Sequence, residues 1–449
     1  MTRSSYPAAA MTRVLRNLGL RAEQPTPGGA ALVAVAAANV ALWVAARPAG
    51  QPTGRFIGEI CGAEAVLLFS CTLVLATLLP AIERAFSGLD RVVVWHRRTA
   101  TAGVLLLIPH WALATSSPDR YATGIGPGLG DLALLGLLIL TVWALAPTLR
   151  AARWPGPIRR LARTTYEHWL TPHRLTGIFV ATAVAHGALV DPVLHRSTLL
   201  RVVFLTVGGV GVAAYLYREL FARFVVPIYD YRVADVRRPN DTMLEVSLDP
   251  VRVPIEFVPG QFVFLAFGGP NGWQRHPFSV ASAPSDRRLE VAIKAVGDYT
   301  RRLRDEIRSG DAAKVAGPFG GFDYKRGGKE QIWIAGGIGI TPFMSWIRSF
   351  DDSFDRDVAF FYSVAHESDT VYLDEIEQAG KEHPTFVPHV VVADRDGFLT
   401  AEKAAAGRTL ADVWVYMCGP PPMTKALRDG FLRIGIPRSR LRWEEFAAR

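Results

Sequence analysis

Long apolar segments fill the first half of this chain, and they limit its possible folds more than any other feature. A helix needs about 20 mostly apolar residues to cross the hydrocarbon core of a bilayer. Runs of suitable length occur at residues 30–47, 57–80, 99–116, 129–148, 174–190 and 198–217. The sequence therefore predicts an α-helical membrane bundle with six spans.

The first apolar run fits a second interpretation as well. An arginine-bearing leader precedes an alanine-rich stretch that ends with Arg47, Pro48 and Ala49. A cleaved signal peptide has a similar order of basic, apolar and small residues. We favour a membrane span, preceded by a cytosolic segment at residues 1–28.

Arginine residues gather in alternate connections between the runs. The connections after the second and fourth runs carry Arg84, Arg91, Arg97, Arg98, Arg150, Arg153, Arg159, Arg160 and Arg163, whereas the opposite side offers Arg55, Arg120 and Arg196. Basic loops stay on the cytoplasmic side, so we expect a multi-pass protein of the cell membrane with both termini in the cytosol. This topology also accounts for the net charge of +9, so membrane lipid rather than nucleic acid is the expected partner.

The second half of the chain reads as globular. Short β-type runs at 261–267, 289–294 and 312–316 are separated by turn residues, a pattern that predicts a small β-barrel. Strands at 331–335 and 413–417 alternate with helical stretches, which is typical of a parallel α/β sheet. We therefore expect a transmembrane domain at 29–220, a β-barrel domain at 226–324 and an α/β domain at 329–449.

Four histidines lie at matched positions near two of the apolar runs. His96 and His110 are fourteen residues apart, and His173 and His186 are thirteen apart. A fourteen-residue step along a helix covers about 21 Å and returns to nearly the same face. Ionisable residues at membrane depth usually mark a pathway or a cofactor, and imidazole is a common haem ligand. The sequence therefore favours two bis-histidine haem sites, His96 with His173 and His110 with His186.

The thirteen-residue spacing raises a geometric objection to this assignment. It turns an ideal helix by about 220°, which would place His173 and His186 on different faces. Pro172 places His173 in the first turn of its helix, where a local irregularity would allow both rings to face the same way.

The three cysteines, Cys61, Cys71 and Cys418, lack the spacing of a thiolate metal site.

Two groups of residues in the second half are arranged to bind phosphate. Lys294 precedes a predicted helix that begins near Thr300, and a helix N-terminus with a nearby lysine attracts a pyrophosphate. Further on, a predicted strand ends in a glycine turn that lets a dinucleotide phosphate approach the backbone. That turn comprises Gly336, Gly337, Gly339, Thr341 and Pro342. A second strand-to-helix turn at Cys418, Gly419 and Pro420 should lie beside the nicotinamide.

Taken together, these motifs resemble the ferric reductase and NADPH oxidase family over roughly residues 57–449. The likeness rests on the paired histidines and on several short segments. These are His276, Pro277, Phe278 and Ser279, then Gly317 to Gly320, Gly336 to Pro342, Cys418 to Pro420, and Glu445 with Phe446. The resemblance implies FAD, two b-type haems and NAD(P)H as cofactors. It further implies that His276 to Ser279 line the flavin ring, that Lys294 and Thr300 bind its phosphates, and that Phe446 covers the ring face. Cys418 and Phe446 would be the catalytic residues, and the family tolerates the thirteen-residue histidine spacing.

The resemblance implies electron transfer from cytosolic NAD(P)H to an external small-molecule acceptor. NADH and NADPH both stay open, because Ala365 and His366 follow Ser363 where NADPH-preferring relatives often carry an arginine. Hard oxygen or histidine ligands for ferric iron are sparse outside the membrane: Asp119 in one loop, and Asp191 with His195 in another. We therefore favour dioxygen, reduced to superoxide, over a ferric complex. A haem-binding relay subunit that serves a partner protein is a further alternative.

Overall fold

The computed structural model describes residues 26–86, 88–115, 124–149, 166–221, 227–268 and 273–445. The chain divides into two compact units, Met1–Val225 and Val226–Arg449, and each is described by itself. The predicted cytosolic segment before residue 26 and the arginine-rich connection at 150–163 lie outside the described residues.

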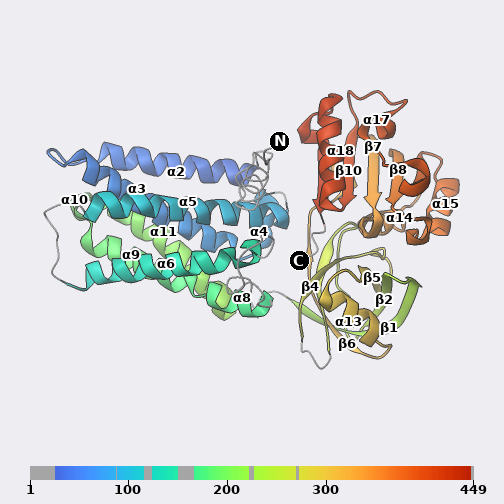
Figure 1. Ribbon diagram of the computed structural model, residues 1–449, viewed down its shortest axis with the longest axis horizontal. Coiled ribbons are helices and arrows are strands. Elements are labelled where there is room, and N and C mark those ends of the chain that lie inside the picture. The colour runs from blue at the N-terminus through green and yellow to red at the C-terminus, as the bar shows by residue number, and fades with distance from the viewer. Residues whose placement is uncertain are drawn as a thin grey trace, which may run out of the picture. The chain divides into compact units, whose positions relative to one another are not determined.

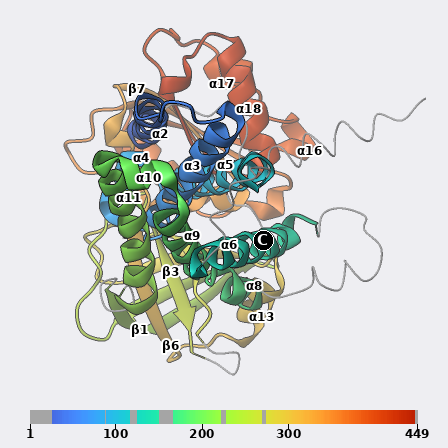
Figure 2. The ribbon, with the colours of Figure 1, turned by 90° about the vertical axis from the view of Figure 1, so that its left-hand side faces the viewer.

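The first unit is a bundle of long helices that run side by side (Figure 1). Helix α3 packs against α5 and α11, and α6 packs against α9, as the view along the bundle shows (Figure 2). The long helices are α2 (Pro27–Ala45), α3 (Thr53–Leu75), α5 (Leu89–Thr115), α6 (Ile125–Leu149), α9 (Thr176–Val190) and α11 (Thr198–Leu216), and the short ones are α4 (Pro80–Phe86), α8 (Tyr166–His173), α10 (Pro192–Arg196) and the π-helical turn η1 (Tyr217–Phe221).

Five segments of the described residues are long and apolar enough to cross a membrane by length and composition. They are Pro27–Ala45, Thr53–Leu75, Ile125–Leu145, Trp169–Val190 and Thr198–Phe221. Helix α5 covers the third predicted span but is not among them, because Arg97, Arg98 and His110 reduce its apolar character. A sixth span on α5 therefore stays a prediction.

Two helix ends differ from the sequence prediction. Helix α3 ends at Leu75 rather than at residue 80, because Leu78 adopts a left-handed φ of 56° and Pro80 restricts the residue before it. Helix α5 begins at Leu89, well before the predicted start at residue 99. The basic residues from Arg91 to Arg98 therefore lie on a helix and not in a loop.

The second unit begins with a curled antiparallel sheet in the order β4-β3-β6-β1-β2-β5. A bridge between Val280 and Val291 brings the edge strands β4 and β5 together, so the sheet closes on itself as a small barrel. Its apolar core includes Val246, Val263 and Leu265, all fully buried. The strands are β1 (Ile228–Asn240), β2 (Met243–Pro250), β3 (Phe262–Phe267), β4 (His276–Ser279), β5 (Leu289–Lys294) and β6 (Ala312–Phe319), with helix α13 (Asp298–Glu306) between β5 and β6.

A parallel sheet in the order β11-β10-β7-β8-β9 follows. The chain winds from β7 to β8 and β9 on one side, then crosses to β10 and β11 on the other, so the direction of winding reverses between β7 and β10. Dinucleotides bind at such a switch point in parallel α/β sheets. The strands are β7 (Glu330–Gly336), β8 (Asp357–Val364), β9 (Phe386–Val392), β10 (Trp414–Gly419) and β11 (Leu441–Glu445).

Helices connect these strands, and one apolar core spans both sheets of the second unit. Trp333, Phe343 and Trp346 of the parallel-sheet part cluster with Phe322 and Tyr324, which follow the barrel strands. The helices are α14 (Thr341–Ile347), α15 (Leu373–Glu382), α16 (Ala393–Asp396), α17 (Ala401–Ala405) and α18 (Pro421–Arg433). The shared core fixes the two parts of this unit against each other.

Candidate cofactor sites

The four predicted histidines form two facing pairs inside the helical bundle. His96 and His173 have ring centres 6.3 Å apart, and His110 and His186 are likewise 6.3 Å apart. Helix α5 supplies His96 and His110, α8 ends at His173 and α9 carries His186. The structure thus places the histidines in the two pairs that the sequence predicted.

A break in the helix allows the thirteen-residue spacing. Helix α8 ends at His173, a turn at Arg174 and Leu175 follows, and α9 begins at Thr176. Because the backbone is not one continuous helix between the two histidines, the rotation expected for an ideal helix does not apply. His173 also stacks on Trp169, with ring centres 5.1 Å apart.

Backbone carbonyls fix the orientation of three of the rings. The Nδ1 atoms of His96, His110 and His186 lie 3.0, 2.8 and 2.9 Å from the carbonyl oxygens of Thr72, Gly58 and Gly126. A carbonyl only accepts, so Nδ1 carries the proton and Nε2 keeps its lone pair. Hydrogen bonding of one ring nitrogen in this way is how proteins set the tautomer of a metal-binding histidine.

The spacing within each pair fits a metal ion between the two rings. Two imidazole nitrogens at about 2 Å from one ion place the ring centres roughly 6 Å apart. Glycines give the pair of His110 and His186 its room: a Cβ at Gly62 would lie 2.5 Å from Nδ1 of His110, and a Cβ at Gly130 would lie 2.6 Å from the His186 ring. Sequence reasoning missed these two glycines, although a small residue in an apolar helix marks a close approach by a neighbour.

The predicted flavin segment forms edge strand β4 of the barrel. Its register places Ser279 opposite Phe262 and Pro277 opposite Phe264 on β3. The Ser279 hydroxyl is buried and has no hydrogen-bond partner among the described residues. A buried polar atom of this kind normally has a partner, so the site fits a bound group that supplies one. Gly317 and Gly320 lie on β6 and just after it, with φ values of 147° and 102°.

Tyr299 is a further residue of this site that the sequence prediction omitted. Its ring stacks on His276 with the ring centres 3.7 Å apart. Burial raises the pKa of the Tyr299 hydroxyl to about 12, so the phenol stays protonated at physiological pH. A flat aromatic pair at the edge of the barrel offers a surface for a planar ligand.

The predicted pyrophosphate residues lie around the start of helix α13. Lys294 is the last residue of β5 and is half-buried. The Thr300 hydroxyl accepts hydrogen bonds from the amides of Val296 and Gly297, both at 3.1 Å, and so caps the helix. Thr300 therefore shapes the loop whose amides would face a phosphate, in addition to any direct contact.

Both nicotinamide turns meet at the switch point of the parallel sheet. A Cβ at Gly339 would lie 2.1 Å from the carbonyl oxygen of Cys418, and a Cβ at Gly336 would lie 2.6 Å from the sulfur of Met423. Gly337 has a φ of 53° and open space where a Cβ would stand. Thr341 and Pro342 begin α14, and Gly419 and Pro420 precede α18. The glycines at 336 and 339 hold the two turns together, and Gly337 leaves an open approach to the backbone.

The structure describes Cys418, one of the two predicted catalytic residues, but not the other, Phe446. Cys418 is fully buried, and burial raises the pKa of its thiol well above the ordinary value. A neutral, buried thiol is suited to lining the nicotinamide crevice and not to nucleophilic attack. Phe446 lies outside the described residues, so its placement over the flavin stays a prediction.

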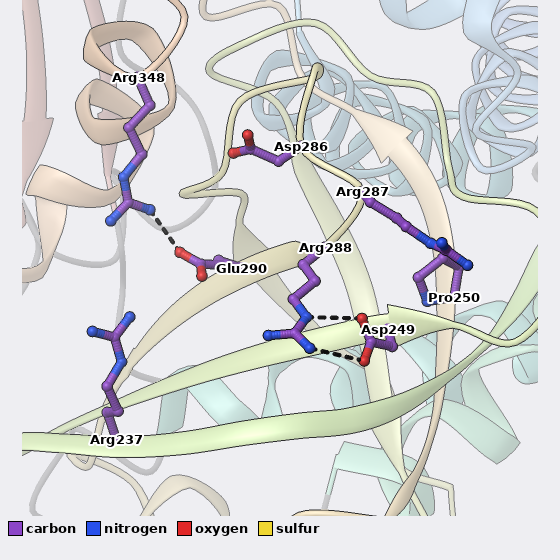
Figure 3. Close-up of a pocket in the computed structure, with 8 residues that line it drawn as sticks. All are labelled: Arg237, Asp249, Pro250, Asp286, Arg287, Arg288, Glu290 and Arg348. Atoms are coloured by element: carbon purple, nitrogen blue, oxygen red, sulfur yellow. Dashed lines mark hydrogen bonds and ion pairs between the residues drawn. The ribbon is translucent and has the colours of Figure 1, made fainter.

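A charged cavity lies apart from these motifs. It has a volume of about 830 Å³ and is a charged groove, and no predicted flavin or nicotinamide residue lines it (Figure 3). Its walls are Arg237, Asp249, Pro250, Asp286, Arg287, Arg288, Glu290 and Arg348. Within the described ranges, no three His, Cys, Asp or Glu side chains are grouped closely enough to hold a metal ion.

The fold and these turns define a flavin- and nicotinamide-dependent reductase module. Residues 228–333 match the family model of an FAD-binding domain, and residues 333–429 match that of an oxidoreductase NAD-binding domain. The second half of this chain therefore belongs to the ferredoxin-reductase-type flavin oxidoreductases.

Two relatives and one solved structure show the extent of the likeness. The reductase component of propane 2-monooxygenase from Mycolicibacterium goodii is 30% identical over 245 residues, which cover 50% of this chain and 69% of the relative. The electron transfer component of toluate 1,2-dioxygenase from Pseudomonas putida is 26% identical over 230 residues, covering 49% and 68%. The flavohemoglobin of Malassezia yamatoensis, solved with FAD and heme, shares 16% identity with a TM-score of 0.50 over 86% of this chain and 95% of its own, a likeness of fold alone.

Proposed function

We propose that this chain is a membrane-embedded oxidoreductase that passes electrons from cytosolic NAD(P)H, through FAD and two b-type haems, to an acceptor outside the membrane. The proposal rests on the two histidine pairs inside the helical bundle. In each pair the ring centres are 6.3 Å apart. FAD accepts a two-electron hydride and releases electrons singly, and haem iron carries one electron at a time. The protein contributes by positioning these groups.

The histidine rings would hold the haems from both faces. Nε2 is the free nitrogen in His96, His110 and His186 because Nδ1 donates to a backbone carbonyl in each. His96 with His173 would form one site and His110 with His186 the other. Both pairs draw one member from α5, so this helix links the two levels of the bundle.

The reductase residues would bind the flavin and the nicotinamide. The buried Ser279 hydroxyl would hydrogen-bond a polar edge of the flavin, and the stacked rings of His276 and Tyr299 would lie beside it. The open backbone at Gly337 would receive the dinucleotide phosphates, with the nicotinamide near Cys418 at the switch point.

Exposed apolar side chains support a membrane location for the helical unit. Large side chains that would otherwise face water include Leu105, Ile108, Leu135, Ile139 and Val142 on α5 and α6. Apolar residues on the outside of a bundle contact lipid tails. Basic residues on α4 and at the start of α5 support a cytosolic position for that end of the bundle.

We propose dioxygen as the acceptor, with superoxide as the product of its one-electron reduction. Asp191 and His195, the candidate ferric ligands after α9, make contacts that stabilise the local fold. The Asp191 carboxylate accepts from the amides of Val193 and Leu194, at 2.8 and 3.1 Å, and His195 Nε2 lies 3.2 Å from the Leu189 carbonyl. Dioxygen needs no such ligands. It needs only access to the haem that His110 and His186 would hold.

Delivery of electrons to a protein partner is the second candidate function. It is favoured by the relatives, which are named as electron transfer and reductase components of larger oxygenase systems. In such a role the helical unit would be a relay, and the purified chain alone would oxidise NAD(P)H slowly in air.

Purified protein in sealed lipid vesicles separates these functions. NADH added outside reaches only the molecules whose reductase unit faces outward, and cytochrome c trapped inside detects superoxide that forms there. We expect reduction of the trapped cytochrome c that superoxide dismutase inside the vesicle prevents. Reduction of a trapped ferric chelate with no superoxide would replace dioxygen with iron as the acceptor. No reaction inside the vesicles, together with rapid NADH oxidation on addition of an external protein acceptor, would overturn transmembrane transfer.

A further inference from the structure

Helix α14 connects the nicotinamide turn to the barrel. It begins at Thr341 and Pro342, directly after the glycine turn, and is buried along its whole length. Side chains along α14 and just after it contact backbone carbonyls of the barrel part, one before strand β3 and others after the flavin strand β4. The Ser345 hydroxyl donates to the carbonyl of Ser282 at 2.8 Å, and the Trp346 indole donates to the carbonyl of Pro259 at 3.0 Å.

Arg348, just after α14, makes charged contacts with both parts of the second unit. Its Nη1 donates to Glu290 of strand β5 at 2.8 Å and to the carbonyl of Ala281 at 3.2 Å. Its Nε and Nη2 donate to the two carboxylate oxygens of Glu375 on α15, at 2.7 and 2.8 Å. The guanidinium therefore connects a barrel strand to a helix of the parallel-sheet part, and Figure 3 shows the Glu290 side of this contact.

The surroundings of Arg348 make this contact hard to replace. The Arg348 side chain is only 16% exposed, and its guanidinium lies 5.3 Å from the centre of the Tyr372 ring. Tyr372 itself has a φ of 62°, a left-handed conformation that non-glycine residues rarely adopt. Breaking an ion pair of a mostly buried guanidinium is more disruptive than breaking an exposed pair.

We infer that Arg348 is a positioning residue for hydride transfer, because it fixes the nicotinamide turn of α14 relative to the flavin segment of the barrel. The inference rests on the flavin and nicotinamide part of the proposed function and is independent of the haems. A displacement of about 1 Å between reacting groups can lower a rate by roughly 100-fold. Arg348 touches neither cofactor motif, so its loss should alter geometry while leaving both binding sites intact.

The groove itself provides a matched control. Arg288 lines the same cavity and forms a two-pronged pair with Asp249, but both partners belong to the barrel part and are about half exposed. Removing Arg288 therefore deletes a comparable ion pair that does not connect the two parts.

The test measures anaerobic flavin reduction by NADH in the full-length purified protein, by stopped flow, at a series of NADH concentrations. For Arg348→Ala and Glu290→Gln we expect the limiting rate to fall at least about 10-fold, with FAD content retained and the half-saturating NADH concentration changed less than about twofold. Arg348→Lys keeps the charge but not the two-pronged geometry, so its rate should lie in between. Arg288→Ala should match the wild type.

Three outcomes would contradict either the positioning role of Arg348 or the proposed function. If the wild type reduces its flavin rapidly and Glu290→Gln and Arg348→Lys do so equally fast, Arg348 has no positioning role. If these variants change only the half-saturating concentration, Arg348 acts on NADH binding and the inference is wrong. If NADH does not reduce the wild-type flavin at all, the proposed function fails instead. Should Arg348→Ala lose its FAD through misfolding, Glu290→Gln and Arg348→Lys still decide the question.

Discussion

The rings of His110 and His186 face each other with their centres 6.3 Å apart, and each is held from behind by the carbonyl of a glycine. Gly58 on α3 holds His110, and Gly126 on α6 holds His186. Both rings therefore keep their Nε2 atoms available for a metal between them. This arrangement needs four helices in one register, so the helices must pack correctly before a haem can bind.

Removal of either ring should remove one haem. We expect His110→Ala or His186→Ala to retain about half of the wild-type haem, because the pair of His96 and His173 remains. Flavin reduction by NADH should be unchanged, since the reductase unit has its own core. His195→Ala is the control, because His195 is exposed and its ring nitrogen lies beside the Leu189 carbonyl, away from both histidine pairs in the sequence. Haem content can be measured from the pyridine haemochrome, and a wild-type value in both variants would refute the outer site.

Glycines beside the histidine rings should affect haem binding as strongly as the rings themselves. Gly130→Ala places a Cβ 2.6 Å from the His186 ring, so the ring must move and the outer haem should be lost or bound weakly. Gly128→Ala lies on the same helix, where a Cβ meets nothing within 4 Å, and should bind haem normally. Because alanine favours helix over glycine by about 1 kcal/mol, a general weakening of α6 would not explain the difference. Equal haem content in the two variants would contradict the assignment.

Ser279 should affect the flavin and not the fold. Its hydroxyl has no partner among the described residues, so Ser279→Ala should leave the thermal midpoint of FAD-free protein unchanged. FAD should bind about fivefold more weakly, as expected for the loss of one neutral hydrogen bond of about 1 kcal/mol. Ser282→Ala is the contrast, because Ser282 accepts from the amide of Glu290 at 3.1 Å and its loss should lower the midpoint. The opposite pattern would show that Ser279 is structural.

The acidic residues that follow strands β8 and β9 predict that the protein prefers NADH to NADPH. Glu367, Asp369 and Asp394 lie there, and an acidic setting repels the extra phosphate of NADPH. The hydrogen bond that the His366 ring donates to the Asp394 carboxylate raises the pKa of His366, so the positive charge on His366 is fully present below its ordinary pKa and is lost as the pH rises through the raised value. The ratio of kcat/KM for NADPH to that for NADH should therefore rise as the pH falls, by roughly two- to fivefold for one exposed charge. A ratio that does not vary with pH in the wild type would refute this role for His366.

The sequence predicted the parts of the site that depend on local pattern. Strand β5 was expected at residues 289–294 and is found there, and the glycine turns at Gly336 and Gly419 follow strands as expected. The histidine pairing depended on spacing along α5, which a continuous helix preserves. The sequence placed His173 in the first turn of its helix, and this was wrong, because His173 ends α8 and a turn separates it from α9.

Contacts across the fold could not be predicted from one sequence. The carbonyls of Gly58 and Gly126 reach the histidines through helix packing, and nothing in their local sequence marks them as partners. Arg348 likewise meets Glu290 and Glu375 through tertiary structure alone. The basic segment from Arg91 to Arg98 was expected as a loop because its charge outweighed its helical pattern, yet it continues α5.

An anaerobic absorbance spectrum of the detergent-purified protein, recorded before and after addition of NADH, shows whether electrons pass from NADH through flavin to haem. We expect flavin and haem bands in the oxidised protein, with about two haems for each FAD. NADH alone, with no partner protein, should bleach the flavin and convert the haem to its reduced spectrum. A protein that contains flavin but no haem, or one whose haem is reduced by dithionite but never by NADH, would contradict the proposed electron transfer.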